Sequence, residues 1–231
     1  MSKSTIRRLS VESLEFRKMM ASAFLQGDQL MINGSEGSDD VRLIVYNSGA
    51  TRVFSGKQTI LEVDRSKFSS IDAAMRGGQD SLQITAQNHH SLISVSVNMG
   101  SGSGESLDLD IGYADNVRID ATKSNRSKVE VSGEIDQLMI LLGAGDDELI
   151  LSNANVVKLE TKAGKGNDKI LFKDSEITTA RIQMGNGRDR IYVDSDSEID
   201  NGTIDGGKGD NLFRKSGAKL SREVKLIRLG K

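Results

Sequence analysis

The sequence contains no cysteine, which excludes disulfide bonds, thiolate nucleophiles and zinc–thiolate sites together. Proline and tryptophan are also absent, and aromatic residues make up only 4% of the 231 residues. A large, irregular core built around aromatic side chains is therefore not expected. The lack of proline also argues against Pro-rich linkers, although 24 glycines are present. Small repeated layers fit this composition better.

The chain has no excess of charge of either sign. Its formal net charge is −2 and its pI is near 5.8, so it lacks a basic footprint for nucleic acid, and no aromatic residues are interleaved for stacking bases. No stretch approaches the roughly 18 consecutive apolar residues of a membrane-spanning helix. We therefore expect no nucleic acid partner and no membrane span.

What the sequence does contain is a repeat rich in Gly and Asp. Its clearest copies begin at glycines separated by 21, 21 and 22 residues: GAGDDELIL from Gly143, GKGNDKILF from Gly164, GNGRDRIYV from Gly185 and GKGDNLF from Gly207. This period is too short for a βαβ unit and matches one turn of a parallel β-helix. The sequence therefore predicts an all-β, single-domain parallel β-helix, or β-solenoid.

The apolar residue after each Gly and Asp element marks one turn, which we call a rung. Traced back along the chain, the equivalent positions are Val41, Ile60, Leu82, Leu107, Val129, Leu149, Ile170, Ile191 and Phe213. They predict about nine rungs of about 21 residues each, over residues 27–213. Inward residues alternate with outward ones, so Leu149, Leu151, Val157 and Leu159 are expected to point into the core.

The C-terminal residues 214–231 differ from the repeat. They combine seven Lys and Arg with the apolar residues Val224, Leu226, Ile227 and Leu229. This composition predicts a basic C-terminal cap strand, whose charge discourages end-to-end stacking. The alternative is a basic anchor for anionic polysaccharide or lipid.

Residues 1–26 begin with basic residues and continue into a short apolar stretch, Met19 to Leu25, which predicts an export segment or an N-terminal cap. The stretch LSVESLEFRKMMA from Leu9 resembles the N-terminus of planctomycete surface and secreted proteins, which carry Leu-x-x-Glu-x-Leu-Glu-x-Arg followed by Leu-Leu-Ala. Here Met19 and Met20 stand where Leu is usual. The resemblance implies an exported protein, extracellular or at the cell surface. The alternative is a short amphipathic helix that caps the first rung.

The repeated glycines and aspartates are expected to form one corner of the solenoid, because glycine tolerates positive φ in a tight bend. Parallel stacking would place Asp147, Asp168 and Asp189 above one another, about 4.8 Å apart. Two unit charges at that distance repel by about 3.5 kcal/mol at an effective dielectric of 20. The column therefore needs a metal ion or the adjacent basic residues, which are Lys165, Lys169, Arg188, Arg190 and Lys208.

The corner resembles the haemolysin-type (RTX-like) calcium-binding repeat GGxGxDxUx, closely at GGKGDNLF from Gly206 and more loosely at the three copies before it. With the elements that end at Val41 and Leu82, the resemblance covers about residues 30–213. In that family, Asp carboxylates and Gly carbonyls of stacked loops hold Ca²⁺. The ligands that the resemblance implies here are Asp147, Asp168, Asp189, Gly145, Gly166, Gly187, Gly209 and, more weakly, Asn211.

This chain departs from the family pattern in two ways. The family usually packs two such loops into each turn, whereas each rung here has one. In addition, Gln58, Glu105 and Ser127 take the place of the aspartate in the middle rungs. A metal-free ladder, neutralised by Lys and Arg, therefore stays open as the alternative.

No catalytic group is indicated. His89 and His90, the only histidines, are adjacent, so in a strand their side chains would point to opposite faces. The sequence predicts a non-enzymatic structural or adhesive module, with surface polysaccharide or a matrix protein as its partner. The alternative is a carbohydrate-binding or polysaccharide-active β-helix, in which outward acids such as Asp108, Asp110 and Asp115 would line a groove.

Overall fold

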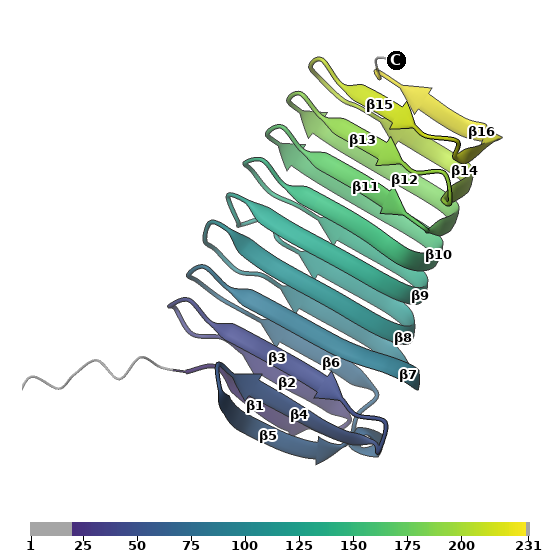
Figure 1. Cartoon of the computed structure of the whole chain (residues 1–231). Coiled ribbons are helices and arrows are strands. Elements are labelled where there is room, and N and C mark those ends of the chain that lie inside the picture. The colour runs from purple at the N-terminus through teal and green to yellow at the C-terminus, as the bar shows by residue number, and fades with distance from the viewer. Residues whose placement is uncertain (1–19, 230–231) are drawn as a thin grey trace, which may run out of the picture.

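The computed structural model of the protein describes residues 20–229, without the side chains of residues 87–90. The chain is 69% strand and forms a β-solenoid of about seven turns with about 22 residues in each turn (Figure 1). The predicted all-β solenoid is therefore confirmed, and the predicted number of nine rungs is too high. Among the described residues no helix is long and apolar enough to cross a membrane.

The strands of the solenoid lie in two faces. Face A consists of β3 (Asp40–Val45), the first halves of β7 (Ser81–Asn98), β8 (Glu105–Asp120), β9 (Ser127–Leu141) and β10 (Glu148–Lys165), and then β11 (Lys169–Lys173), β13 (Arg190–Val193) and β15 (Leu212–Lys215). Face B consists of β2 (Gln29–Asn33), β6 (Ser70–Ala74), the second halves of β7 to β10, β12 (Glu176–Asn186), β14 (Glu198–Asp205) and β16 (Lys219–Ile227). Neighbouring strands within each face are parallel, so the backbone hydrogen bonds run along the solenoid axis.

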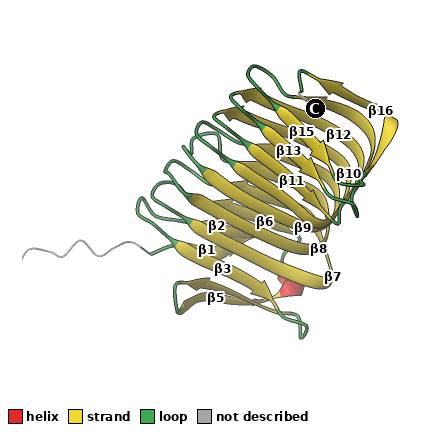
Figure 2. Ribbon diagram, turned by 45° about the horizontal axis from the view of Figure 1, so that its top comes forward, coloured by secondary structure: helices red, strands yellow, loops and turns green. Residues whose placement is uncertain are grey.

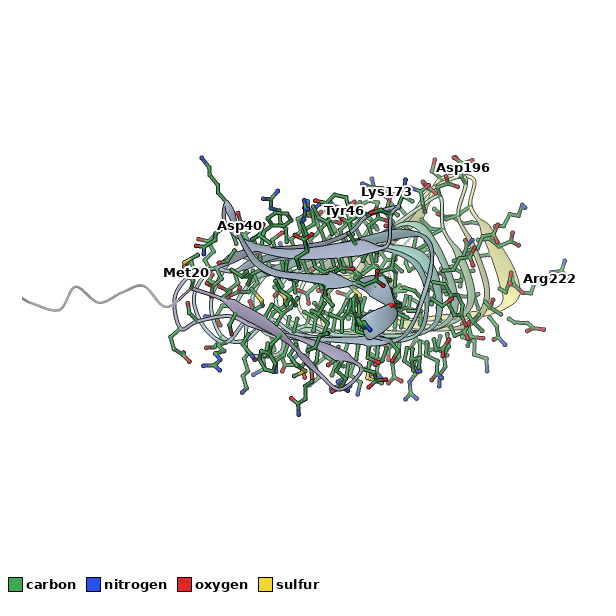
Figure 3. The ribbon with its side chains drawn as sticks, turned by 90° about the horizontal axis from the view of Figure 1, so that it is seen from below. Met20, Asp40, Tyr46, Lys173, Asp196 and Arg222 are labelled. Atoms are coloured by element: carbon green, nitrogen blue, oxygen red, sulfur yellow. The ribbon has the colours of Figure 1, made fainter. Side chains whose placement is uncertain are left out.

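The core is a set of apolar columns between the two faces. On face A, strand pairing places in one column Val41, Leu82, Leu107, Val129, Leu149, Ile170, Ile191 and Phe213. All but Phe213 are at most 1% exposed. Viewed along the axis, side chains fill the space between the faces (Figure 3). Since each rung alone leaves its apolar residues uncovered, burial depends on the neighbouring rungs.

Ile60 was wrongly predicted to mark a rung, which accounts for the high count. It lies in β5 (Gln58–Asp64), which pairs antiparallel with β4 (Ala50–Ser55), and β4 pairs antiparallel with β3. These strands and the short 3-10 helix η1 (Arg65–Lys67) are inserted within one rung and lie at the N-terminal end of the solenoid (Figure 2). The spacing of 41 residues from Val41 to Leu82 is thus one rung with an insertion.

Both ends of the described part of the chain, residues 20–229, are formed by strands. At the N-terminal end, β1 (Ser22–Gln26) pairs antiparallel with β2, so the end of the segment 1–26 belongs to a hairpin, while residues 1–19 lie outside the described residues. At the C-terminal end, β16 pairs with β14 in parallel, and most of its side chains are exposed. The basic segment 214–231 therefore contains the end of β15 and the last strand of face B.

Val157 was also wrongly placed, because a bulge interrupts the alternation in β10. The pairing of β10 with β9 shifts between Leu151 and Ala154, where Asn153 adopts a φ of 52°. As a result Val156 is 2% exposed and Val157 is 52% exposed. The added residue reverses the inward positions as far as Val156, and the alternation then returns, so that Leu159 is buried as predicted.

Candidate metal centre at the glycine–aspartate corner

The glycine–aspartate corner joins the end of each face B strand to the next face A strand, at the loops on the left of Figure 1. Gly166, Gly187 and Gly209 have φ values of 132°, 150° and 126° there. A Cβ atom on these three glycines would lie 1.9, 1.7 and 1.8 Å, respectively, from the carbonyl oxygen of the glycine one rung earlier. Only glycine fits these positions, and the carbonyl oxygens of Gly145, Gly166 and Gly187 form a column.

A second column runs through the acidic residues. The backbone N–H of Asp147 donates to Asp168 Oδ1 at 3.0 Å, and that of Asp168 donates to Asp189 Oδ1 at 2.9 Å. The N–H of Asp189 donates in turn to Asn211 Oδ1 at 2.9 Å. Each side chain thus caps the backbone of the preceding rung, and the three aspartates are only 1–2% exposed. The predicted ligands Asp147, Asp168, Asp189 and Asn211 are therefore brought together in one buried line.

The same ladder continues toward the N-terminus. The N–H of Asp39 donates to Asp80 Oδ1 at 2.9 Å, and that of Asp80 donates to Glu105 Oε2 at 2.8 Å. Glu105 thus replaces an aspartate in the ladder. Ser127 interrupts it, because the N–H of Glu105 donates instead to the Arg126 carbonyl. Gln58, which was expected in the same column, lies in β5 of the N-terminal insertion.

Five of the ladder carboxylates have one buried oxygen without a hydrogen-bond partner, whereas Asp39 Oδ2 accepts from the N–H and the hydroxyl of Ser35. The five unpaired oxygens are Asp80 Oδ2, Glu105 Oε1, Asp147 Oδ2, Asp168 Oδ2 and Asp189 Oδ2. Burial raises the pKa of Asp168 to about 7 and the pKa values of Asp80 and Asp147 to about 6. It also raises the pKa values of Asp189 and Glu105. The ionised form of this column is therefore unfavourable unless a cation is bound, and protonation is the other way to remove the charge.

The neighbouring basic side chains form their ion pairs elsewhere. Lys169 Nζ lies 2.8 Å from Glu148 Oε1, and Arg188 Nε lies 4.0 Å from Asp210 Oδ2. Over residues 20–229, no ion pair joins a Lys or Arg to a carboxylate of the buried column. Neutralisation through direct pairing with Lys or Arg, one of the two predicted possibilities, therefore has no contact to support it.

The donor set at this corner suits a hard cation. Carboxylate and carbonyl oxygens are the ligands that calcium prefers. Within the described part of the chain, no three Asp, Glu, His or Cys side chains come close enough together to hold a metal ion by themselves. A calcium site here would therefore have to add other oxygens to the carboxylates of Asp147, Asp168 or Asp189, and the glycine carbonyls of the same corner loops are one repeated set.

The opposite corner solves the same hydrogen-bonding problem with serine. The N–H groups of Ala154 and Ser175 donate to Ser175 Oγ and Ser197 Oγ, respectively, both at 3.1 Å. Ser175 Oγ donates to the Lys173 carbonyl at 2.9 Å, and Ser197 Oγ donates to Asp194 Oδ1 at 2.6 Å. Sequence reasoning missed this serine corner, although Asp174-Ser175 and Asp196-Ser197 repeat 22 residues apart.

Comparison with protein-family models, curated proteins and solved structures finds no match. The similarities to haemolysin-type repeats and to planctomycete exported proteins therefore stay predictions, carried by the residues quoted for them. The side chains of His89 and His90 lie outside the described ones. Asp108 and Asp110 lie on the outer side of face A, in β8, where Gln83 Nε2 donates to Asp108 and Ser132 Oγ donates to Asp110.

Proposed function

We propose that this protein is an exported, non-enzymatic structural rod, with an adhesive role at the cell surface, whose glycine–aspartate corner is stabilised by calcium. The observation that carries the calcium part is the row of buried carboxylate oxygens without partners. Holding an ionised carboxylate out of water costs several kcal/mol unless it is paired. A row of such groups on successive rungs favours a bound cation.

The need for hydrogen-bond caps does not explain the carboxylates. Serine hydroxyls cap the opposite corner, and the neutral amide of Asn211 caps the N–H of Asp189. Asn211 also donates through Nδ2 to the Gly206 carbonyl at 2.7 Å, so it leaves no polar group in excess. An aspartate adds only a charge and an unpaired oxygen, which supports a role in binding a cation.

Calcium, when bound, would supply positive charge to this column. Asp147, Asp168 and Asp189 would provide carboxylate oxygens, and Gly145, Gly166, Gly187 and Gly209 would provide carbonyl oxygens from the adjacent column. Because these oxygens are aligned only when the rungs are stacked, binding would stabilise the folded state over the unfolded chain.

Calorimetric titration with calcium, combined with thermal melting in calcium, in magnesium and in chelator, tests the metal site. We expect binding heat with calcium and, at a concentration about 100 times the dissociation constant, a stabilisation of about 2.7 kcal/mol. For a chain of this size, that corresponds to a rise in melting temperature of about 5–10 °C. An absence of binding heat together with unchanged melting at millimolar calcium would rule out the calcium column.

A matched pair of variants locates the site. Asp168→Asn keeps an oxygen that can accept from the Asp147 N–H, as Asn211 does for Asp189, and is expected to fold in chelator with a reduced response to calcium. Asp194→Asn, in the serine corner, should respond like the unmodified protein. If Asp168→Asn retained the full response, calcium would be bound elsewhere.

Export is tested separately. Residues 1–26 fused to a reporter enzyme should direct it out of a bacterial cell, whereas a fusion that begins at residue 27 should remain inside. Retention of both fusions would contradict the export part of the proposal and leave the calcium part untouched.

A further inference from the structure

Charge is unevenly distributed along the outer side of face A. In β8 and β9 the outward residues include Asp108 and Glu130, which are directly paired neighbours, and Asp110. Toward the C-terminus the sign reverses, because Lys169 in β11 is the direct neighbour of Arg190 in β13, and Tyr192 is the neighbour of Arg214 in β15. One face of the rod thus carries an acidic centre and a basic C-terminal third.

The basic third has a large excess of exposed cations. Face A strands β11, β13 and β15, with the corner loops that precede them, carry eight Lys and Arg: Lys165, Lys169, Lys173, Arg188, Arg190, Lys208, Arg214 and Lys215. The acidic residues in the same strands and loops are the buried Asp168 and Asp189 and the exposed Asp210. We call these eight residues the basic face. Lys173, one of its members, projects on the outside of the rod in Figure 3.

Most of these cationic side chains form no ion pair with the described residues. Lys169 pairs with Glu148, and Arg188 makes a long contact with Asp210. For Arg190, Lys208 and Arg214 no ion pair is formed with any described residue, and all three are exposed. Their charges are therefore available to a ligand. A bound anion would reduce the repulsion between like charges on adjacent strands.

The basic face borders a groove. An open depression of about 910 Å³ follows the corner across successive rungs. Its charged lining residues are Arg126, Lys169, Arg188, Arg190 and Lys208, together with Asp146, Asp168 and Asp210. In the outward column of face A that contains Glu130 and Arg214, the three strands between them carry Ile150, Leu171 and Tyr192. A groove lined by several cations, with Tyr192 two positions after its lining residue Arg190, suits a long, rigid and hydrated anion.

We propose that the basic face and its groove bind an extended acidic polysaccharide, such as a polyuronate. Parallel strands repeat about every 4.8 Å, a spacing close to the length of one sugar residue in a linear polymer. Cations on successive rungs can therefore meet carboxylates on successive sugars. Arginine is well suited to this contact because its planar guanidinium binds a carboxylate through two hydrogen bonds.

Two other polyanions fit less well. Single-stranded nucleic acid needs several aromatic side chains for stacking, and the outward positions of β11, β13 and β15 offer one, Tyr192. A membrane surface needs apolar side chains that enter the lipid, and none of the large apolar residues exposed in the described part belongs to face A of β11, β13 or β15. The polysaccharide is therefore the partner that the surface favours.

The proposal is tested by titrating the intact protein with sodium polygalacturonate in chelator, so that calcium does not bridge the polymer. We expect binding that weakens as salt is added. The double variant Arg190→Glu with Lys208→Glu should lose about tenfold or more in affinity, since both side chains line the groove. As the matched control, Arg181→Glu places the same reversal on face B, where Arg181 is exposed, and should remain within about twofold of the unmodified protein.

Several results would overturn the inference. These are an absence of binding at low salt, equal loss of affinity in the Arg181→Glu control, and double-stranded DNA binding as tightly as the polyuronate. Melting curves for each variant separate lost affinity from lost structure, because all three positions are exposed and the variants should melt like the unmodified protein. Since the titration is done without calcium, binding of the polyuronate cannot be due to calcium that bridges the polymer to the aspartates, and a failed calcium titration would leave this test unchanged.

Discussion

The two corners of the solenoid differ in how they meet the same requirement. At both corners, a buried backbone N–H is capped by a side chain of the following rung. The serine corner uses hydroxyls that accept one hydrogen bond and donate another, so that Ser175 and Ser197 are fully satisfied. The glycine–aspartate corner uses carboxylates such as Asp147 and Asp168, each of which keeps one buried oxygen unpaired.

Because serine caps are sufficient at one corner, the stacking of the rungs does not by itself require carboxylates as caps. At the serine corner the buried caps, Ser175 and Ser197, are neutral side chains. At the acidic corner, ionisation of the buried carboxylates lowers stability until a cation or protons neutralise the charge. We therefore expect the serine corner to behave identically with and without calcium, and the acidic corner to depend on it.

The largest effect should come from the glycines. In Gly187→Ala the new Cβ atom would lie 1.7 Å from the Gly166 carbonyl oxygen at a φ of 150°, so the rungs could not stack as they do. We expect destabilisation by more than about 4 kcal/mol, or failure to fold, measured by chemical denaturation.

The control lies in the other corner, where Asp174 adopts a φ of 49°. Asp174→Gly should change the free energy of unfolding by about 1 kcal/mol or less, because glycine accepts that conformation readily. If Gly187→Ala were tolerated equally well, the close stacking of the acidic corner would be wrong.

The next effect is the pH dependence of stability in chelator. Burial raises the pKa of Asp168 from 3.8 to about 7 and those of Asp80 and Asp147 from 3.8 to about 6. Between about pH 3.8 and about pH 7 the folded state holds more protons than the unfolded state, so the free energy of unfolding falls as pH rises. We expect the melting temperature to drop by about 5–10 °C from about pH 5 to about pH 8.

Calcium should remove most of this drop, because it replaces the protons that neutralise the column. A melting temperature that rises with pH over the same range in chelator would show that the carboxylates are paired rather than desolvated.

A smaller effect is expected from Ser175→Ala. The change removes the acceptor of the Ala154 N–H and the donor to the Lys173 carbonyl, leaving a buried N–H unpaired. Destabilisation should be about 1–3 kcal/mol by denaturant unfolding, and it should be equal in calcium and in chelator. A loss confined to one of the two conditions would mean that the corners are coupled.

Asp194→Asn should have the smallest effect. Its carboxylate accepts from the Asp174 N–H and from Ser197 Oγ at the solvent-facing side of the serine corner, and an amide oxygen can accept as well. We expect a change within about 0.5 kcal/mol. A larger loss would show that the charge of this residue, rather than its oxygen, supports the corner.

Much of the architecture could be predicted because repetition is visible in the sequence. The spacing of Leu149, Ile170 and Ile191 gave the parallel register, and Gly166 and Gly187 marked the tight corner. The count of rungs failed at Ile60, because the inserted strands β4 and β5 carry the same apolar alternation as a rung. Only their antiparallel pairing distinguishes β4 and β5 from the strands of a rung, and the direction of pairing cannot be read from the composition.

The site was predicted in part. Stacked aspartates were expected from the repeat, but their capping of the preceding rung depends on side-chain direction, which spacing does not fix. The serine corner was missed because serine is common in loops and a two-residue match at Ser175 and Ser197 is a weak signal. Val157 was misplaced because a positive φ at Asn153 shifts the alternation by one residue.

The buried caps of the acidic corner point one way along the chain, whereas the exposed N–H groups of Asn167 and Arg188 are capped by Asp146 and Asn167 of the preceding rung. Asp168 completes the backbone of the rung before it, and Asp189 completes that of Asp168. The buried N–H at the acidic corner of each of these rungs is thus capped only by the following rung, so a chain that orders from its N-terminus carries one uncapped buried donor at its newest turn. The order in which the buried caps form is therefore directional. A break in the middle of the rod would leave the last buried N–H of the N-terminal half without its acceptor, and it would leave the first capping side chain of the C-terminal half without its donor.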